Sequence, residues 1–249
     1  MTSKRLDEEL LRRGLLQSRS RARDAVLRGI VLVNGSPARK PSQPALETDQ
    51  LELRDDSAKY VSRAALKLLH GLDHFGIDVK GRHCLDLGAS TGGFTQVLLE
   101  RGADHVIAID VGHGQLAPAL LRDKRITLHE GLNARDLTPD IVSENISLIV
   151  CDMSFISLKL ALPPALSLVC RDTNLLALIK PQFEVGRDHV GKGGLVTDEA
   201  QHQRVCQEIK TFLQDADWRV AGTIPSPLEG GDGNREFLIA AVKCSRTVQ

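Results

Sequence analysis

Residues 84 to 94 read Cys-Leu-Asp-Leu-Gly-Ala-Ser-Thr-Gly-Gly-Phe, an apolar run that passes directly into a glycine-rich turn. The apolar residues predict a short buried strand, and the residues after the turn have the pattern of a helix. A strand, a glycine turn and a helix in this order leave backbone N–H groups open to a ligand. The segment therefore predicts a βα unit that binds a nucleotide-like cofactor.

Further apolar runs follow along the rest of the chain. They predict strands over residues 105–110, 126–129, 146–151, 175–179, 218–222 and 237–242. Helical patterns or turns separate them, and this alternation is typical of an α/β fold with a doubly wound sheet. We therefore expect a Rossmann-like domain of about seven strands, with the last pair antiparallel. A length of 249 residues, 42% of them hydrophobic, suffices for such a core.

The N-terminal region has a different pattern. Four leucines lie on one face of a helix predicted over residues 4–14, and a second helix should begin at Ser18 or Ser20, because serine is a good N-cap. Residues 30–33 lead as a strand into an Asn-Gly turn, and residues 50–53 supply another strand. We thus predict a small α+β domain, a linker with the start of a helix, and the large domain, over residues 1–57, 58–65 and 66–249.

The charge of the whole chain indicates no partner, because 32 basic residues balance 32 acidic ones. Through residue 45, however, basic residues outnumber acidic ones by about six, which suggests a nucleic-acid contact surface. Arg19, Arg21 and Arg23 lie near the start of the second predicted helix, where the helix dipole does not favour positive charge. Their placement predicts a phosphate partner, with ordinary solvated arginines as the alternative.

The five cysteines are widely spaced and form no Cys-x-x-Cys motif, so we expect neither a disulfide framework nor a metal site. Reduced cytosol fits this cysteine usage best. No apolar run approaches the roughly 18 residues of a membrane helix, and the first residues have no apolar signal core. We therefore expect a cytoplasmic protein without stable membrane association.

The N-terminal region contains a series of short motifs and single residues: Arg5-Leu-Asp7, Gly14-Leu-Leu-Gln-Ser-Arg19, Ala22, Gly29, Val31, Val33-Asn-Gly35 and Lys40-Pro41. In this order they resemble the RNA-binding domain first known from ribosomal small-subunit protein four. In that fold, side chains at the start of the second helix and around the hairpin contact RNA phosphates. The resemblance implies RNA contacts by Arg5, Ser18, Arg19, Arg21 and Lys40.

The glycine turn over residues 88–93 is not a clean G-x-G-x-x-G and lacks the lysine of a phosphate loop, which disfavours a dinucleotide. Asp86 would repel a pyrophosphate but suits a sulfonium or ammonium group. The pattern Asp-x-Gly-x-x-x-Gly-Gly resembles the first motif of S-adenosylmethionine-dependent methyltransferases. The resemblance implies cofactor contacts by Asp86, Gly88, Ser90, Thr91, Gly92, Gly93 and Phe94.

Three features beyond the turn complete the predicted cofactor region. Asp110 ends the next strand, where an acid can accept both hydrogen bonds of a ribose diol, although a turn or cap residue is the alternative. Asn133 resembles a family position near the adenine, with an ordinary surface loop as an equal alternative. Residues 186–194 form either a lid that orders on RNA or an ordinary connection.

Charged residues occupy four further positions of interest. Asp152 and Lys180 end two predicted strands, and the carboxyl ends of parallel strands line the ligand crevice of open α/β sheets. Glu236 stands at the start of the last strand. Lys67 lies on a predicted helix, on the face opposite the apolar one, and this periodicity alone favours a solvated lysine.

Five segments surround these positions: Tyr60-Val-Ser-Arg-Ala-Ala-Leu-Lys67, Asp86-Leu-Gly-Ala-Ser-Thr-Gly-Gly-Phe94, Cys151-Asp-Met-Ser-Phe-Ile-Ser157, Lys180-Pro-Gln-Phe-Glu184 and Gly233-Asn-Arg-Glu-Phe237. The order Lys-Asp-Lys-Glu on a methyltransferase scaffold resembles the ribose 2′-O-methyltransferases related to FtsJ. With the N-terminal domain, the chain resembles the TlyA family of haemolysin-A-like rRNA methyltransferases. The resemblance implies methyl transfer from S-adenosylmethionine to a cytidine 2′-OH in ribosomal RNA or ribosomal subunits.

Lys180 is the predicted general base, because burial beside a second ammonium favours a neutral lysine. Lys67 would be that ammonium or would stabilise the developing alkoxide, while Asp152 and Glu236 would hold the lysines in position. Which lysine is neutral stays open, since these influences oppose one another. Three other functions remain as alternatives: a non-catalytic RNA-binding or ribosome-assembly protein, a pore-forming haemolysin and a small-molecule O-methyltransferase.

Overall fold

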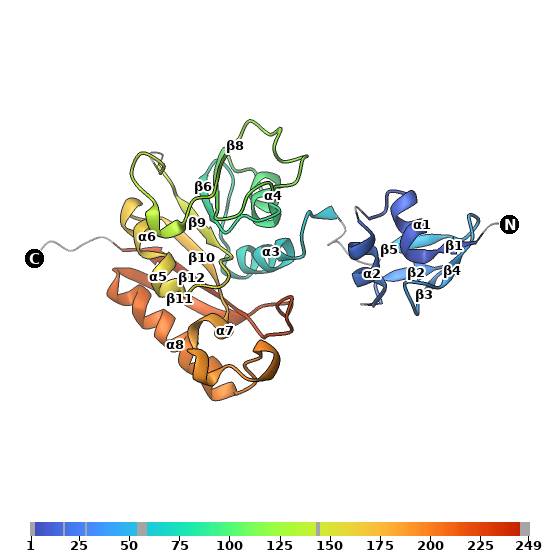
Figure 1. The fold of residues 1–249 in the computed structure, drawn as a ribbon. Helices are drawn as coiled ribbons and strands as arrows, with labels where there is room; N and C mark the ends of the chain where they lie inside the picture. Colours follow the sequence, from blue (N-terminus) through green and yellow to red (C-terminus); the bar gives the residue numbers. More distant parts are fainter. Residues whose placement is uncertain (1–2, 17, 28, 54–58, 143–144, 245–249) are drawn as a thin grey trace, which may run out of the picture. The chain divides into compact units, whose positions relative to one another are not determined.

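The computed structural model describes residues 3–16, 18–27, 29–53, 59–142 and 145–244 (Figure 1). Contacts within the chain divide it into two compact units, Met1–Tyr60 and Val61–Gln249. We call them the N-terminal domain and the sheet domain, and describe each by itself. The domain boundary that we predict at residue 57 lies outside the described residues.

The described residues of the N-terminal domain form two helices and five short strands: β1 (Lys4–Arg5), α1 (Leu6–Arg12), α2 (Arg19–Leu27), β2 (Val31–Val33), β3 (Ser36–Pro37), β4 (Pro44–Ala45) and β5 (Leu51–Leu53). Strand β2 lies between β3 and β5, and β1 pairs with β4. The Oγ of Ser18 accepts a hydrogen bond from the N–H of Arg21 at 3.2 Å, which caps α2 as the sequence predicts. The first helix is shorter than the predicted 4–14, because residues 4 and 5 pair as a strand.

The sheet domain contains a seven-stranded sheet in the order β11-β12-β10-β9-β6-β7-β8. Its strands are β6 (His83–Leu87), β7 (His105–Asp110), β8 (Ile126–Glu130), β9 (Leu148–Cys151), β10 (Asn174–Ile179), β11 (Trp218–Pro225) and β12 (Phe237–Lys243). Only β12 runs antiparallel to its neighbours β10 and β11, which confirms the predicted α/β fold with its antiparallel last pair. All four residues of β9 are buried, as in parallel strands covered on both faces.

Helices cover both faces of this sheet (Figure 1). The helices and 3₁₀ turns of the domain are α3 (Ala64–Phe75), α4 (Gly93–Glu100), η2 (Ala134–Asp136), α5 (Leu158–Ala161), α6 (Pro163–Leu168), α7 (Pro181–Glu184), η3 (Arg187–His189), η4 (Lys192–Gly194) and α8 (Glu199–Asp215). Helices α3 and α4 pack on β10, β12, β6 and β7, whereas α8 packs on β10, β11 and β12. Buried leucines and isoleucines of the central strands meet Val205, Ile209 and Leu213 of α8 in the main core.

The direction of the chain reverses at the centre of the sheet. From β6 the chain moves outward through β7 to β8, then returns to β9 on the other side of β6. The carboxyl ends of β6 and β9 therefore flank the point where α/β sheets bind their ligands. None of the helices in the described part of the chain is long and apolar enough to cross a membrane.

Candidate active site

The glycine turn lies at the carboxyl end of β6 and is packed on two sides. Gly88 and Gly92 have φ angles of 85° and 95°, in the left-handed region that favours glycine. A Cβ at Gly88 would lie 2.8 Å from the carbonyl oxygen of Asp152, and one at Gly92 would overlap the side chain of Leu120. The N–H of Gly88 donates to the carbonyl of Ile109 at 2.9 Å. The turn is thus fixed between the ends of β7 and β9.

Two residues that we expect among the cofactor contacts are buried beneath this turn. The side chain of Phe94 is 2% exposed, and that of Asp86 is 0% exposed. Asp86 Oδ2 accepts a hydrogen bond from Thr95 Oγ1 at 2.6 Å, while Oδ1 has no hydrogen-bond partner among the described residues. Burial raises the pKa of Asp86 to about 7, against the opposing hydrogen bond from Thr95. Both side chains therefore support the turn from inside the domain, and neither presents a contact surface to a ligand.

Asp110 organises the backbone around the turn. One carboxylate oxygen accepts a hydrogen bond from the N–H of Ser90 and the other from the N–H of Gly112, both at 2.7 Å. Each oxygen retains a second lone pair, so the carboxylate can still accept a ribose hydroxyl. Ser90 has a φ of 48°, which brings its N–H toward this carboxylate in the turn. A ribose contact by Asp110 stays a prediction.

Asn133 borders a cavity of about 590 Å³ beside the turn. Its side chain caps η2 by accepting from the N–H of Arg135 at 3.0 Å. Val111, Phe155 and Leu160 also line the cavity, and their side chains are 66%, 90% and 60% exposed. Sequence reasoning missed Phe155, because a phenylalanine with a φ of 65° has no local sequence signal. The cavity combines polar groups with an apolar wall, as small-molecule sites commonly do.

The four charged residues singled out from the sequence lie around one smaller cavity of about 260 Å³. They form two ion pairs. Lys67 Nζ lies 2.6 Å from Glu236 Oε2, and Lys180 Nζ lies 2.6 Å from Asp152 Oδ1. Helix periodicity alone favours a solvated Lys67, but the structure buries this side chain in α3. Burial is possible because Glu236 pairs with the ammonium group. The fold thus brings together residues from α3, β9, β10 and β12.

The two ion pairs differ in their surroundings. The side chains of Lys67 and Glu236 are 9% and 3% exposed, whereas Asp152 is 17% exposed. Burial raises the pKa of Glu236, and the attraction of Lys67 opposes this increase. Lys180 also donates to Ser154 Oγ at 2.9 Å, a contact that sequence reasoning missed. A position two residues after Asp152 is the only sequence signal for that serine.

The loop of residues 186–196 borders the site, and hydrogen bonds hold its C-terminal end. Asn234, which is 1% exposed, donates through Nδ2 to the carbonyl of Gly194 and accepts from the N–H of Val196, both at 2.9 Å. The carbonyl of Val196 also lies 2.8 Å from His202 Nε2. Residues 194–196 are therefore held to the segment that carries Glu236, and the part of the loop before them bears fewer contacts of this kind.

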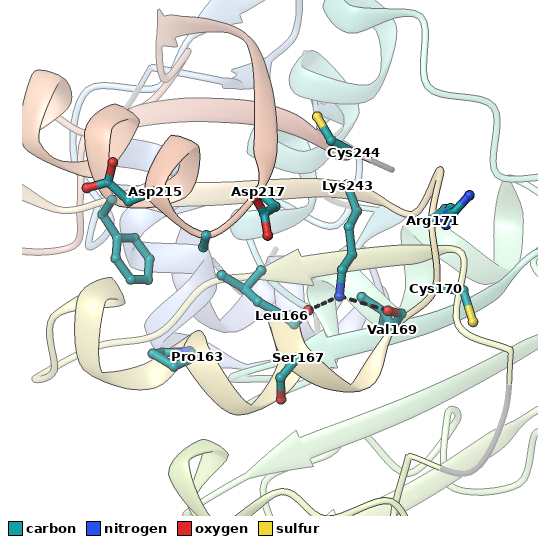
Figure 2. Close-up of a pocket in the computed structure, with 12 residues that line it drawn as sticks. Pro163, Leu166, Ser167, Val169, Cys170, Arg171, Asp215, Asp217, Lys243 and Cys244 are labelled. Atoms are coloured by element: carbon teal, nitrogen blue, oxygen red, sulfur yellow. Dashed lines mark hydrogen bonds between the residues drawn. The ribbon is translucent and has the colours of Figure 1, made fainter. Parts of the chain in front are cut away.

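A larger cavity lies away from this site. It has a volume of about 830 Å³, and its lining includes the ends of α6 and α8 (Figure 2). There, Lys243 Nζ donates to the carbonyls of Leu166 and Val169 at 2.5 and 2.9 Å, and so ties β12 to the end of α6. None of the site residues predicted from the sequence lines this cavity, and it adjoins the amino end of β10, opposite the crevice.

The predicted RNA contacts of the N-terminal domain have partners within the domain. Arg5 binds Asp7 through two hydrogen bonds of 3.0 and 2.9 Å, and Arg19 lies 3.3 Å from Asp7 and 3.1 Å from Glu8. Arg21 donates to the carbonyl of Tyr60. Asp7 and Glu8 thus already neutralise Arg19, one of the arginines for which the helix dipole suggests a phosphate partner. A phosphate contact by these arginines stays a prediction.

The same arginines remain accessible. The side chains of Arg5 and Arg19 are 45% and 55% exposed, and Lys40 is exposed beside the hairpin. A second buried acid, Glu9, binds Arg12 and Arg13, and these hydrogen bonds lower the pKa of Glu9 to about 2. Part of the basic excess thus neutralises buried carboxylates, and part faces the solvent.

Comparisons with known proteins agree with this architecture. The profile of the family described as FtsJ-like methyltransferase matches residues 60–243, and that of the S4 domain matches residues 4–51. The 16S/23S rRNA (cytidine-2′-O)-methyltransferase TlyA of Mycobacterium tuberculosis is 46% identical over 94% of this chain and 88% of the relative. Hemolysin A of Brachyspira hyodysenteriae is 39% identical over 94% of this chain and 98% of the relative.

A solved structure from Streptococcus thermophilus, whose name assigns it provisionally to the hemolysins, has a TM-score of 0.77 and 37% identity. The alignment covers 98% of this chain and 90% of that one. A methyltransferase structure from Listeria monocytogenes, at 14% identity and a TM-score of 0.55, shares the fold of the sheet domain over 73% of the chain. Since the family profile covers most of the chain and full-length relatives carry the same two domains, the chain belongs to the FtsJ-like methyltransferases and, within them, to the TlyA family.

Proposed function

We propose that this protein transfers the methyl group of S-adenosylmethionine to the 2′-OH of a cytidine in ribosomal RNA. The observation that carries the proposal is the meeting of two lysine–carboxylate pairs around one cavity, beside the glycine turn of a methyltransferase fold. The relatives named as rRNA cytidine-2′-O-methyltransferases support the substrate. A ribosomal substrate also predicts a cytoplasmic enzyme.

The residues around the turn fit the cofactor. The left-handed φ angles of Gly88 and Gly92 shape the turn, and the carboxylate of Asp110 beside it retains lone pairs that can accept hydrogen bonds from a ribose. S-adenosylmethionine supplies a methyl group activated by the positive charge of its sulfonium. We expect Asp110 to bind the ribose and Asn133 to lie beside the adenine, while the backbone from Gly88 to Gly93 holds the methionine part.

The protein must align and deprotonate a ribose hydroxyl, whose pKa lies well above neutrality. Lys180 accepts the proton of the 2′-OH, and Asp152 holds the lysine at the edge of the cavity. Lys67 stabilises the negative charge that develops on the ribose oxygen, and Glu236 fixes its position. The two lysine side chains are almost equally exposed, at 10% and 9%, and the place of Lys180 at the carboxyl end of β10, where parallel strands line the ligand crevice, supports its assignment as the proton acceptor.

The N-terminal domain would hold the RNA. Its S4 family match and the exposed basic side chains of Arg5, Arg19 and Lys40 support phosphate contacts there. Arg21 and Ser18 at the start of α2 complete the predicted contact set. Phosphate contacts fix the orientation of an RNA but carry little sequence information, so we assign the choice of nucleotide to the crevice of the sheet domain.

Transfer of tritium from labelled S-adenosylmethionine to purified ribosomal subunits or naked ribosomal RNA tests the proposal. We expect incorporation with the natural protein and none above background with Lys180→Ala, whose affinity for S-adenosylmethionine should remain normal because the glycine turn is intact. A dye-release assay on lipid vesicles serves as the control for a pore. Vesicle leakage without tritium transfer would contradict the proposal, and near-normal turnover by Lys180→Ala would exclude the assigned base.

A further inference from the structure

We infer that Ser154 is a positioning residue that aims the amine of Lys180 at the substrate hydroxyl. The inference rests on the proposed function and deepens it. Ser154 was not among the residues that the sequence singled out, yet its Oγ accepts a hydrogen bond from Lys180 Nζ at 2.9 Å. It lines both the cavity of about 440 Å³ that it shares with Lys180 and the apolar cavity beside Asn133.

The geometry of the amine explains why a second partner matters. A lysine Nζ has four tetrahedral directions, of which one is the bond to Cε. Ser154 Oγ takes a second direction as a hydrogen-bond acceptor at 2.9 Å, whereas Asp152 Oδ1 lies 2.6 Å from Nζ as an ion-pair partner without hydrogen-bond geometry. In the neutral amine the two remaining directions hold one hydrogen atom and the lone pair that accepts a proton, and the negative charge of Asp152 favours the hydrogen atom on its side. Without the bond to Ser154, the amine could rotate about Cε–Nζ and turn the lone pair away from the substrate.

The segment that carries Ser154 is itself held at both ends. Before it, the N–H of Asp152 donates to the carbonyl of Leu87 at 2.9 Å. After it, Ser157 Oγ and the N–H of Leu158 donate to the carboxylate of Glu184 at 2.6 and 2.8 Å. Glu184 ends α7, the helix that begins directly after Lys180. The serine is therefore fixed relative to the element that carries the lysine.

A role in aiming the lysine predicts a specific kinetic pattern. Ser154→Ala should lower kcat for methyl transfer by about ten- to hundredfold, because misaligned reacting groups lose this much. The KM for ribosomal RNA and the affinity for S-adenosylmethionine should stay within about twofold of the natural values. The reason is that the proposed role of the serine is to orient Lys180, and not to bind the RNA or S-adenosylmethionine. Ser154→Thr retains a hydroxyl and should recover most of the rate. Ser167→Ala, in the remote cavity of Figure 2, is the matched control.

NMR of the lysine ε-methylene groups provides a readout that does not depend on turnover. With ¹³Cε-labelled lysine, the variant Lys180→Arg identifies the Lys180 signal. We expect Ser154→Ala to lower the order of this side chain, while Lys67, which pairs with Glu236, stays unchanged. Loss of order only at Lys180 together with a fall in kcat and rescue by threonine supports the inference.

Two different failures can be told apart. An unchanged order of Lys180 in Ser154→Ala, or a kcat within about twofold of the natural protein, would overturn the role of Ser154. Absence of methyl transfer by the natural protein would instead overturn the proposed function. In that case the NMR comparison still decides whether Ser154 fixes the amine. Equal melting temperatures of the two proteins exclude misfolding as the cause of any effect.

Discussion

At the scale of single residues, the site depends on charges that the fold buries in pairs. Removing one member of a buried pair leaves the other without compensation, which is strongly destabilising. Lys67 and Glu236 are the more buried pair, so they hold α3 to the start of β12 as well as serving the cavity. The Asp152–Lys180 pair is more exposed and lies where a substrate could reach it.

Asp86 gives a pH dependence that stability measurements can detect. Burial raises the pKa of Asp86 from 3.8 to about 7, so the folded state favours the protonated form. The protonation of Asp86 therefore contributes to the free energy of unfolding, fully so below pH 3.8, and this contribution is lost as the pH rises through about 7. Asp86→Asn removes this loss. Urea unfolding should therefore show the variant gaining stability relative to the natural protein between pH 4.5 and pH 8, by up to about 3 kcal/mol.

The sign of this trend is the critical result. A stability difference between Asp86→Asn and the natural protein that is constant across the pH range would show that Asp86 does not titrate there. A difference that shrinks as the pH rises would contradict the direction of the shift. Asp123→Asn is a suitable control, because Arg125 lowers the pKa of this half-buried aspartate instead of raising it.

At the scale of elements, the contact between α3 and β10 limits side-chain size. A Cβ at Gly71 would lie 2.8 Å from Leu176 Cδ2, and Leu176 is 0% exposed and cannot move aside freely. Gly71→Ala gains about 1 kcal/mol of helix propensity but costs about 1–3 kcal/mol of overpacking. We expect a net loss of unfolding free energy of about 1 kcal/mol by urea titration.

A double-mutant cycle checks that the cause is this contact. Leu176→Val removes a carbon from the facing side chain, so the double variant should be more stable than the sum of the single effects predicts. Strict additivity of the two substitutions would contradict the steric explanation.

The sequence predicts most elements of the sheet domain because its central strands are buried on both faces and therefore read as continuous apolar runs. It also predicts that Asp152 and Lys180 lie at strand ends. Three features depend on tertiary structure and escape such reasoning. Lys67 is buried by a residue 169 positions later, and Phe155 adopts a left-handed conformation. Asp7 and Glu8 pair with Arg19, a charge partner that the helix-dipole argument does not consider.

At the scale of the whole molecule, the proposed function assigns RNA binding to the N-terminal domain and methyl transfer to the sheet domain. Lys40 is exposed beside the hairpin of the N-terminal domain, and among the described residues no carboxylate pairs with its side chain. If it binds a phosphate, Lys40→Ala should weaken binding to ribosomal RNA and reduce the slope of log Kd against log salt concentration by about one. The turnover of saturated enzyme should not change.

Filter binding or fluorescence anisotropy over a range of salt concentrations measures this slope. Lys124→Ala, which removes an exposed lysine outside the predicted contact set, controls for net charge. Equal salt slopes for both variants would remove Lys40 from the RNA contacts while leaving the methyl-transfer site untouched.

The central claim is that the cavity between the two lysine–carboxylate pairs methylates a ribose oxygen. The most direct test is mass spectrometry of nucleosides from ribosomal RNA incubated with S-adenosylmethionine and the natural protein, or with Lys180→Ala. We predict 2′-O-methylcytidine with the natural protein and no increase with the variant. A methyl group on a base instead of the ribose, or equal 2′-O-methylcytidine in both reactions, would contradict the account.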